Sequence, residues 1–158
     1  MATTEMIEAN SQVSNESSIY RALNPNHLDG GLPGDNHFVM KQNHPVDDGV
    51  SMGITALITL PQLRSIEILK QSYGDGFGVA ELSVAEALAP VAGTGIRIIQ
   101  QDATEWGEFA RAHAILTGYQ MLIGREGKRK IREFQRHIVK LARKRFYPPG
   151  SDSASSVQ

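Results

Sequence analysis

The segment from about Gly127 to Phe146 constrains the fold of this chain more than any other feature. Its large apolar side chains recur at the spacing of one helix face, at Ile131, Phe134, Ile138, Leu141 and Phe146. The positions between them are almost all polar or charged. This pattern is typical of an amphipathic helix whose apolar stripe is covered by another layer. We therefore predict a long helix near the C-terminal end of the chain.

The same helix concentrates the positive charge of the protein. Residues 125–145 hold ten Lys or Arg against two Glu, a net charge of +8, whereas the whole chain has a net charge of −1. The remaining residues therefore carry a net charge of −9. The basic side chains that we consider for binding are Lys128, Arg129, Lys130, Arg132, Arg136, Lys140, Arg143 and Lys144.

Three interpretations of this basic helix stay open at the sequence level. A row of Lys and Arg could bind phosphates and release counterions from a nucleic acid. It could dock on an acidic protein, including the acidic remainder of this chain or of a second copy. It could also pack only on its own domain and leave its charges in water. No aromatic interleaving and no known groove-reading motif accompanies the charges.

The rest of the chain alternates short apolar runs with turn residues. Runs of strand type lie at residues 19–23, 77–82, 96–99 and 112–116, with a shorter extended run at 37–41. Residues 50–60 are ambiguous between strand and loop. Helices are predicted at about 61–71 after an N-cap at Thr59, from Ser83 to before Pro90, and around 104–109.

Because strands and helices interleave irregularly, we expect an α+β fold rather than a doubly wound sheet. The prediction is a single domain over residues 19–146, with a small mixed or antiparallel sheet and the long basic helix. Residues 1–18 lack apolar periodicity, and in residues 147–158 Tyr147 is followed by two prolines and then by a serine-rich stretch. We predict that both of these end segments are disordered.

The chain contains no cysteine, which excludes disulfides, thiolate nucleophiles and cysteine-ligated zinc. We expect no membrane span and no secretory signal, and therefore a cytoplasmic protein, although a dedicated secretion apparatus stays compatible with the sequence. A loop with His37, His44, Asp47 and Asp48 offers nitrogen and oxygen ligands. Because no two histidines have the spacing of a helical metal site, we predict neither a metal nor another cofactor.

A candidate catalytic set consists of Arg21, His37, Ser51 and His113, with Tyr20 beside Arg21. A histidine and a phosphate-binding arginine could cleave RNA by acid–base catalysis, and Ser51 could bind a ribose. Tyr20-Arg21 with a downstream serine resembles ADP-ribosyltransferase toxins, but no Ser-Thr-Ser element and no clear catalytic Glu motif follow. Alternatively, all of these are ordinary sheet and turn residues, because nothing in their spacing forces them together.

The order of several short motifs resembles a group of small, mostly uncharacterised bacterial proteins. The motifs are Tyr20-Arg21, His37-Phe38, Asp48-Gly49-Val50-Ser51, Phe77-Gly78-Val79-Ala80 and Ala112-His113-Ala114-Ile115, before a basic tail helix. The chain departs from the group at Asn36-His37, where a small-residue pair is expected, and by an insertion at 118–124. The resemblance implies a single-domain bacterial fold and no particular activity.

The sequence therefore predicts a small binding module that engages nucleic acid or an acidic protein partner through its basic helix. One alternative is a toxin-like enzyme that acts on RNA or on a nucleotide through Arg21, His37, Ser51 and His113. The other alternative is a structural partner in a larger bacterial assembly.

Overall fold

The computed structural model describes residues 10–42, 45 and 49–154. Within these residues, six strands pair antiparallel in one sheet of order β4-β5-β2-β1-β3-β6. The strands are β1 (Ser18–Leu23), β2 (Val50–Ile54), β3 (Gly78–Ser83), β4 (Arg97–Gln100), β5 (His113–Thr117) and β6 (Phe146–Tyr147). The described chain is thus a single α+β domain, as the sequence predicts.

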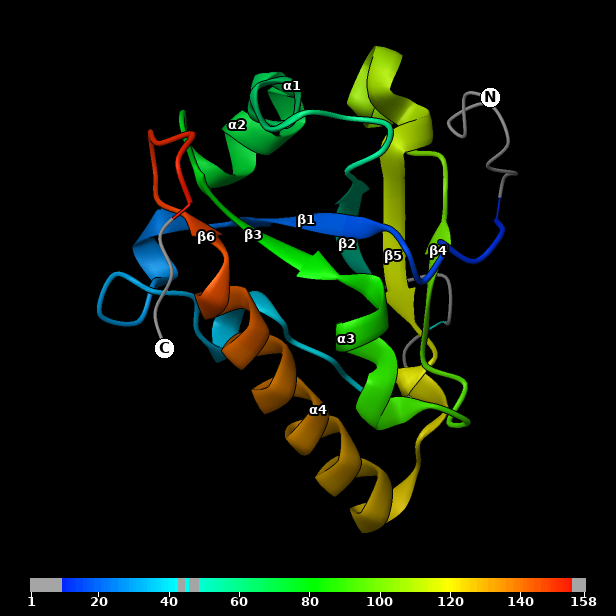
Figure 1. The fold of residues 1–158 in the computed structure, drawn as a ribbon. Coiled ribbons are helices and arrows are strands. Elements are labelled where there is room, and N and C mark those ends of the chain that lie inside the picture. The colour runs from blue at the N-terminus through cyan, green and yellow to red at the C-terminus, as the bar shows by residue number, and fades with distance from the viewer. Residues whose placement is uncertain (1–9, 43–44, 46–48, 155–158) are drawn as a thin grey trace.

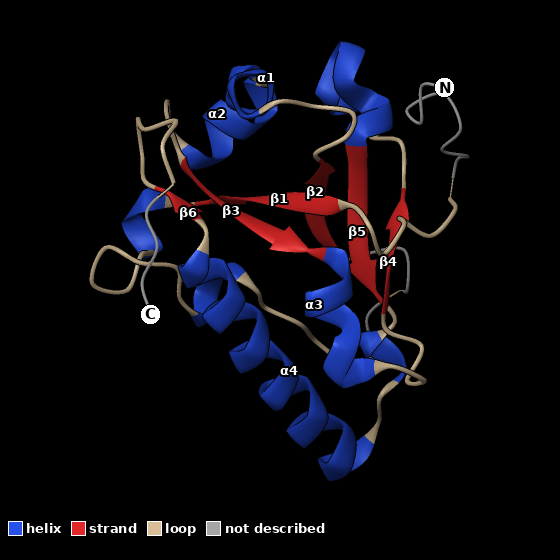
Figure 2. Cartoon of the chain, viewed as in Figure 1, coloured by secondary structure: helices blue, strands red, loops and turns tan. Residues whose placement is uncertain are grey.

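Helices cover both faces of this sheet. The α-helices are α1 (Leu60–Ser65), α2 (Glu67–Tyr73), α3 (Val84–Leu88) and α4 (Gly124–Lys144). The 3-10 segments are η2 (Pro25–His27), η3 (Asp35–His37), η4 (Ala89–Val91), η5 (Thr104–Ala112) and η6 (Tyr119–Met121). Figure 1 shows α1 and α2 on one side of the sheet and α3 and α4 on the other, and Figure 2 shows the strands between them.

Side chains alternate between the two faces along each strand, so each face has its own core. On the side of α4, Ile19 and Met52 belong to the same buried cluster as Phe134. On the side of α1 and α2, Ala22 and Val79 join a second cluster with Leu63, Trp106 and others. Neighbouring residues of one strand therefore lie in different environments, which decides where candidate site residues can meet.

The long C-terminal helix is confirmed, and its stripe is buried at Ile131, Phe134 and Ile138. The helix ends at Lys144 rather than at Phe146, because Phe146 pairs with Ala80 as part of β6. This short edge strand has no periodicity of its own and was not expected from the sequence.

The predicted helix at 61–71 is two helices. Thr59 and Gln62 form a reciprocal capping box that starts α1. At Ile66 the backbone becomes extended, with φ −67° and ψ 119°, so α1 stops there and α2 begins at the next residue. Ile66 is buried in the same cluster as Leu63, and this packing accompanies the break.

The segment 37–41 is also not the extended run that the sequence predicts. Asp35–His37 form the 3-10 turn η3, and Phe38 after it is fully buried. The His37 carbonyl accepts a hydrogen bond from Nε of Arg21 at 2.9 Å. A side chain thus satisfies this carbonyl where a neighbouring strand would otherwise do so.

Packed residues extend beyond both predicted domain bounds. Val13 is buried, and its N–H donates to the Ile98 carbonyl at 2.9 Å, so residues before β1 lie along β4. At the other end, Arg64 donates to the carbonyls of Pro148 and Ser151. The domain therefore includes described residues that the sequence assigns to disordered ends.

Candidate functional site

Two of the predicted catalytic residues are in direct contact. The Ser51 hydroxyl oxygen lies 2.7 Å from Nε2 of His113, and Nδ1 of the same ring lies 2.7 Å from the Gln101 carbonyl oxygen. The strands β2 and β5 are neighbours, and their register places Gly53 opposite His113 and Ser51 opposite Ile115. Ser51 and His113 thus point to the same face of the sheet as diagonal neighbours.

The surroundings of His113 fix its protonation state. The ring is buried against Trp106, edge to face with centroids 4.9 Å apart. Burial lowers the pKa of His113 below 6.5, although the hydrogen bond to the Gln101 carbonyl opposes this shift. Because a carbonyl only accepts, Nδ1 carries the proton, and neutral Nε2 accepts from the Ser51 hydroxyl. This is the arrangement in which a histidine can withdraw a proton from a serine.

Arg21 and His37 do not contact the hydroxyl or the ring of this pair. Arg21 lies on the same face of β1 as Ile19 and Leu23, which face α4, whereas Ser51 and His113 face α1 and α2. The Arg21 guanidinium donates to the His37 carbonyl at 2.9 Å and to the Ser51 carbonyl at 3.0 Å. Arg21 therefore bonds the backbone of Ser51 and not its hydroxyl. The four predicted residues do not form one catalytic set.

His37 is the one buried side chain among the described residues with a polar atom that lacks a partner, its Nε2. Burial, together with a smaller contribution from the neighbouring charge of Arg21, lowers the pKa of His37 to about 4. A ring held neutral in this way bears no charge for phosphate binding at neutral pH. Its carbonyl, bonded to Arg21, has a structural role.

Little room for a substrate exists beside Ser51. The recess next to it, lined by Tyr20, Leu63 and Trp106 among others, has a volume of about 10 Å³. Such a volume accepts about one water molecule. Moreover, the group that orients His113 is the backbone carbonyl of Gln101, whereas a catalytic triad has a carboxylate at this position.

A second candidate site is the exposed side of α4. Six basic side chains follow one another every three or four residues and so share one flank of the helix. We call them the basic stripe: Arg125, Lys128, Arg132, Arg136, Lys140 and Arg143. At a rise of about 1.5 Å per residue the stripe is about 27 Å long. All of them are exposed except Arg143, which is partly buried.

Most of these charges are uncompensated. Among the ion pairs of the described residues, Arg143 is the member of the stripe that has one, with Asp29 at 3.2 Å. The other predicted binding residues differ from the stripe. Arg129 pairs with Glu126 and with Glu133. Lys130 and Lys144 lie on the opposite flank of α4.

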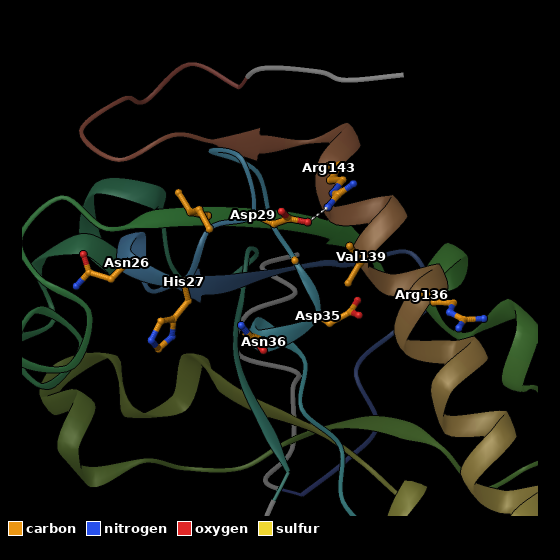
Figure 3. Close-up of a pocket in the computed structure, with 10 residues that line it drawn as sticks. Asn26, His27, Asp29, Asp35, Asn36, Arg136, Val139 and Arg143 are labelled. Atoms are coloured by element: carbon orange, nitrogen blue, oxygen red, sulfur yellow. Dashed lines mark hydrogen bonds and ion pairs between the residues drawn. The ribbon is translucent and has the colours of Figure 1, made fainter.

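A polar cavity of about 650 Å³, which we call the groove, borders the basic stripe. Figure 3 shows its two walls, α4 on one side and the loop that carries η2 and η3 on the other. The side chains that matter below are Asn26, His27, Asp35, Asn36, Arg136 and Val139. Arg136 belongs to both the stripe and the groove, which makes the two surfaces continuous.

Hydrogen bonds from α4 hold the loop in place. The Gln135 amide donates to the carbonyls of Asp35 and Phe38, each at 3.0 Å. Nε of Arg143 donates to the Pro33 carbonyl at 2.7 Å. The loop is rich in turn residues, and nothing in its sequence predicts Asn26, Asp35 and Asn36 as site residues; Arg125 on α4 is not among the basic side chains considered from the sequence either. No sequence pattern places a loop beside a helix about 100 residues later.

No metal centre is evident in the described ranges, where no three His, Asp or Glu side chains are grouped as metal ligands. His44, Asp47 and Asp48 of the loop that offers such ligands lie outside the described residues. None of the helices in the described ranges combines the length and the apolar content that a membrane-spanning helix requires.

No protein-family model, no curated protein and no solved structure matches this chain. No functional inference for this chain can therefore be drawn from a relative. The resemblance to small bacterial single-domain proteins stays a prediction.

Proposed function

We propose that this protein is a nucleic-acid-binding module and that the basic stripe on α4 contacts the phosphates. The observation that carries the proposal is the row of five basic side chains, Arg125, Lys128, Arg132, Arg136 and Lys140, that pair with no described carboxylate. A regular row of cations matches a regular row of phosphates.

An acidic protein is the less favoured partner. Protein interfaces depend on buried apolar or aromatic anchors, with charges mainly at the rim. The large apolar side chains that are exposed in the described chain are Val39, Ile68, Met121 and Ile123, and none of them lies within α4. Within α4 the stripe therefore offers charge without an apolar anchor, and the exposed Met121 and Ile123 lie only at its start, before Arg125.

Counterion release predicts how steeply the binding constant should fall with added salt. Five phosphate contacts predict a slope of log K against log salt of about −3.5 for a single strand and about −4.5 for a duplex. Binding should therefore weaken by roughly two to three orders of magnitude between about 50 mM and 200 mM salt. The contacts are to the backbone, so little sequence preference should accompany them.

The test is fluorescence anisotropy with labelled oligonucleotides over a salt series. The double variant Lys128→Gln, Arg132→Gln should weaken binding and flatten the slope by about 1.4 to 1.8, at 0.7 to 0.9 per lost contact. The matched control is Lys130→Gln, Lys144→Gln, which removes the same charge from the opposite flank and should flatten the slope much less. Equal losses in both variants, or no binding by wild type at low salt, would contradict the proposal.

An enzyme that acts on RNA or on a nucleotide is the second candidate, and the Ser51–His113 contact favours it. The candidate is reduced to these two residues, because Arg21 and His37 do not contact the hydroxyl or the ring. It requires the layer of α1, α2 and η5 to open, since the recess beside Ser51 is too small for a substrate. The test is RNA cleavage by wild type and by His113→Ala. Equal activity of the two proteins would show that Ser51 and His113 are not catalytic.

A cytoplasmic setting fits both candidates and is part of the proposal, since a chain without cysteine needs no oxidising compartment. A structural role in a larger assembly stays a prediction that no described contact favours over nucleic-acid binding.

A further inference from the structure

The groove beside the basic stripe has the size of a small-ligand site, and its lining is mostly polar. Its volume of about 650 Å³ lies within the ordinary range for such sites, roughly 300–1,000 Å³. Its walls combine the apolar side chains Leu28 and Val139 with the exposed ring of His27. A flat ligand can therefore pack on these groups while its edge meets polar atoms.

The polar groups of the groove are available for a ligand. The carboxylate of Asp35 and the amides of Asn26 and Asn36 form no hydrogen bond with other described residues, and all three are exposed. Amides offer both donors and acceptors, and the carboxylate accepts from N–H groups. These are the partners that the hydrogen-bonding edge of a nucleobase needs.

The charges of the groove favour a ligand with one phosphate beside a neutral ring. Arg143 and Asp29 neutralise each other as an ion pair at 3.2 Å. Arg136, a member of the stripe, then supplies a positive charge on the helix wall, and Asp35 supplies a negative charge on the loop wall. A phosphate is attracted to the first, and a base with an amino group is attracted to the second.

We propose that the groove receives one base of a single-stranded nucleic acid whose phosphates lie along the basic stripe. This inference rests on the proposed function and names its substrate class. In a duplex the base edges are paired and stacked, so a base can enter the groove only after it is extruded, which costs a few kcal/mol. The protein should consequently prefer a single strand to a duplex of the same sequence.

The first experiment compares oligo(dA) of about 12 nucleotides with the duplex of oligo(dA) and oligo(dT) of the same length, by anisotropy at equal salt. We expect wild type to bind the single strand about tenfold more tightly, the lower end of the gain for one stacked base. A 2-aminopurine in the single strand should change its fluorescence when the complex forms, because the base leaves its stacked neighbours.

The second experiment uses Asp35→Ala, for which two physical effects have opposite signs. Removal of a negative charge near the stripe should by itself strengthen binding of any polyanion. Loss of the acceptor for the adenine amino group should instead weaken binding of oligo(dA). We expect the single strand to bind about tenfold more weakly and the duplex to bind equally or slightly more tightly. The matched control is Asp75→Ala, the same change in the exposed turn before β3.

The outcomes separate this inference from the proposed function. If wild type binds the single strand and the duplex equally, or if Asp35→Ala strengthens both, the groove does not receive a base but the basic stripe still binds nucleic acid. If wild type binds neither at low salt, both proposals fail. Loss of single-strand preference in Asp35→Ala and in Asn36→Ala, with an unchanged salt slope, is the result that supports the groove.

Discussion

The Ser51 hydroxyl and Nε2 of His113 lie 2.7 Å apart although 62 residues separate them in the chain. The contact depends on the pairing of β2 with β5, and the Gln101 carbonyl completes it on the other ring nitrogen. Both nitrogens of this buried ring are thus satisfied. His37, also buried, keeps one nitrogen without a partner among the described residues. The two histidines should therefore respond differently to mutation and to pH.

Removal of the Ser51 hydroxyl should destabilise the fold. In Ser51→Ala, Nε2 of His113 loses its donor while the ring stays buried, which costs about 1–3 kcal/mol. The measurement is urea unfolding at neutral pH. Ser72→Ala, an exposed serine in α2, serves as the control and should change little. A wild-type unfolding curve for Ser51→Ala would mean that water or another group replaces the hydroxyl.

Stability should fall as the pH decreases from about 6.5 to about 4, partly because of His37. Its pKa is about 4 in the folded protein against 6.5 for the free side chain. Over this range the unfolded chain binds a proton that the folded chain does not, so protonation favours unfolding. In His37→Gln the dependence on pH should be shallower. The measurement is the free energy of unfolding at several pH values, and parallel curves for the two proteins would refute the assignment.

Gly127→Ala should destabilise the protein although alanine ordinarily favours a helix by about 1 kcal/mol over glycine. A Cβ at this position would lie 2.5 Å from the carbonyl carbon of Leu122 and 2.9 Å from Nε2 of Gln42. Gln42 itself donates to the Leu122 carbonyl and so ties the loop after η3 to the start of α4. We expect a cost of about 1–3 kcal/mol from this overlap.

The control for that substitution is Lys128→Ala, one residue further along the same helix and exposed. It should be neutral within about 0.5 kcal/mol in thermal or urea unfolding. If Gly127→Ala is instead more stable than wild type, Leu122 and Gln42 must shift to admit the Cβ with little loss of free energy.

The C-terminal segment should contribute to stability through Arg64. This side chain is 10% exposed and donates to the carbonyls of Phe77, Pro148 and Ser151. Arg64→Ala removes all of these bonds and should cost about 1–3 kcal/mol. Arg64→Lys should restore only part, because an ammonium lacks the planar fork that reaches several carbonyls at once.

Arg97→Ala is the matched control, since Arg97 is only partly buried and bonds the Gly95 carbonyl two residues away. The melting temperature checks these variants together with a chain truncated after Pro148. An unchanged melting temperature in the truncated chain would mean that this segment does not stabilise the fold, as expected for the disordered end that the sequence predicts.

Local periodicity made part of this structure predictable. The α4 stripe of Ile131, Phe134 and Ile138 repeats at 3.6 residues, and this alone indicates the helix and the flank on which its charges lie. The capping residues Thr59 and Ser83 likewise indicate where α1 and α3 begin. Such signals act within a few residues, so the sequence by itself determined the α+β class, the long helix and its concentration of basic residues. The structure added Arg125 to the basic stripe and separated Arg129, which pairs with Glu126 and Glu133, from it.

Only the tertiary structure decided which of the candidate residues meet. Strand order brings Ser51 to His113, and the alternation of β1 turns Arg21 to the opposite face. The groove exists because Gln135 holds the backbone of Asp35, 100 residues away, against α4. Contacts of this range depend on how strands pair and layers pack. No local pattern encodes them, because the same short segments are compatible with many pairings until the whole core selects one.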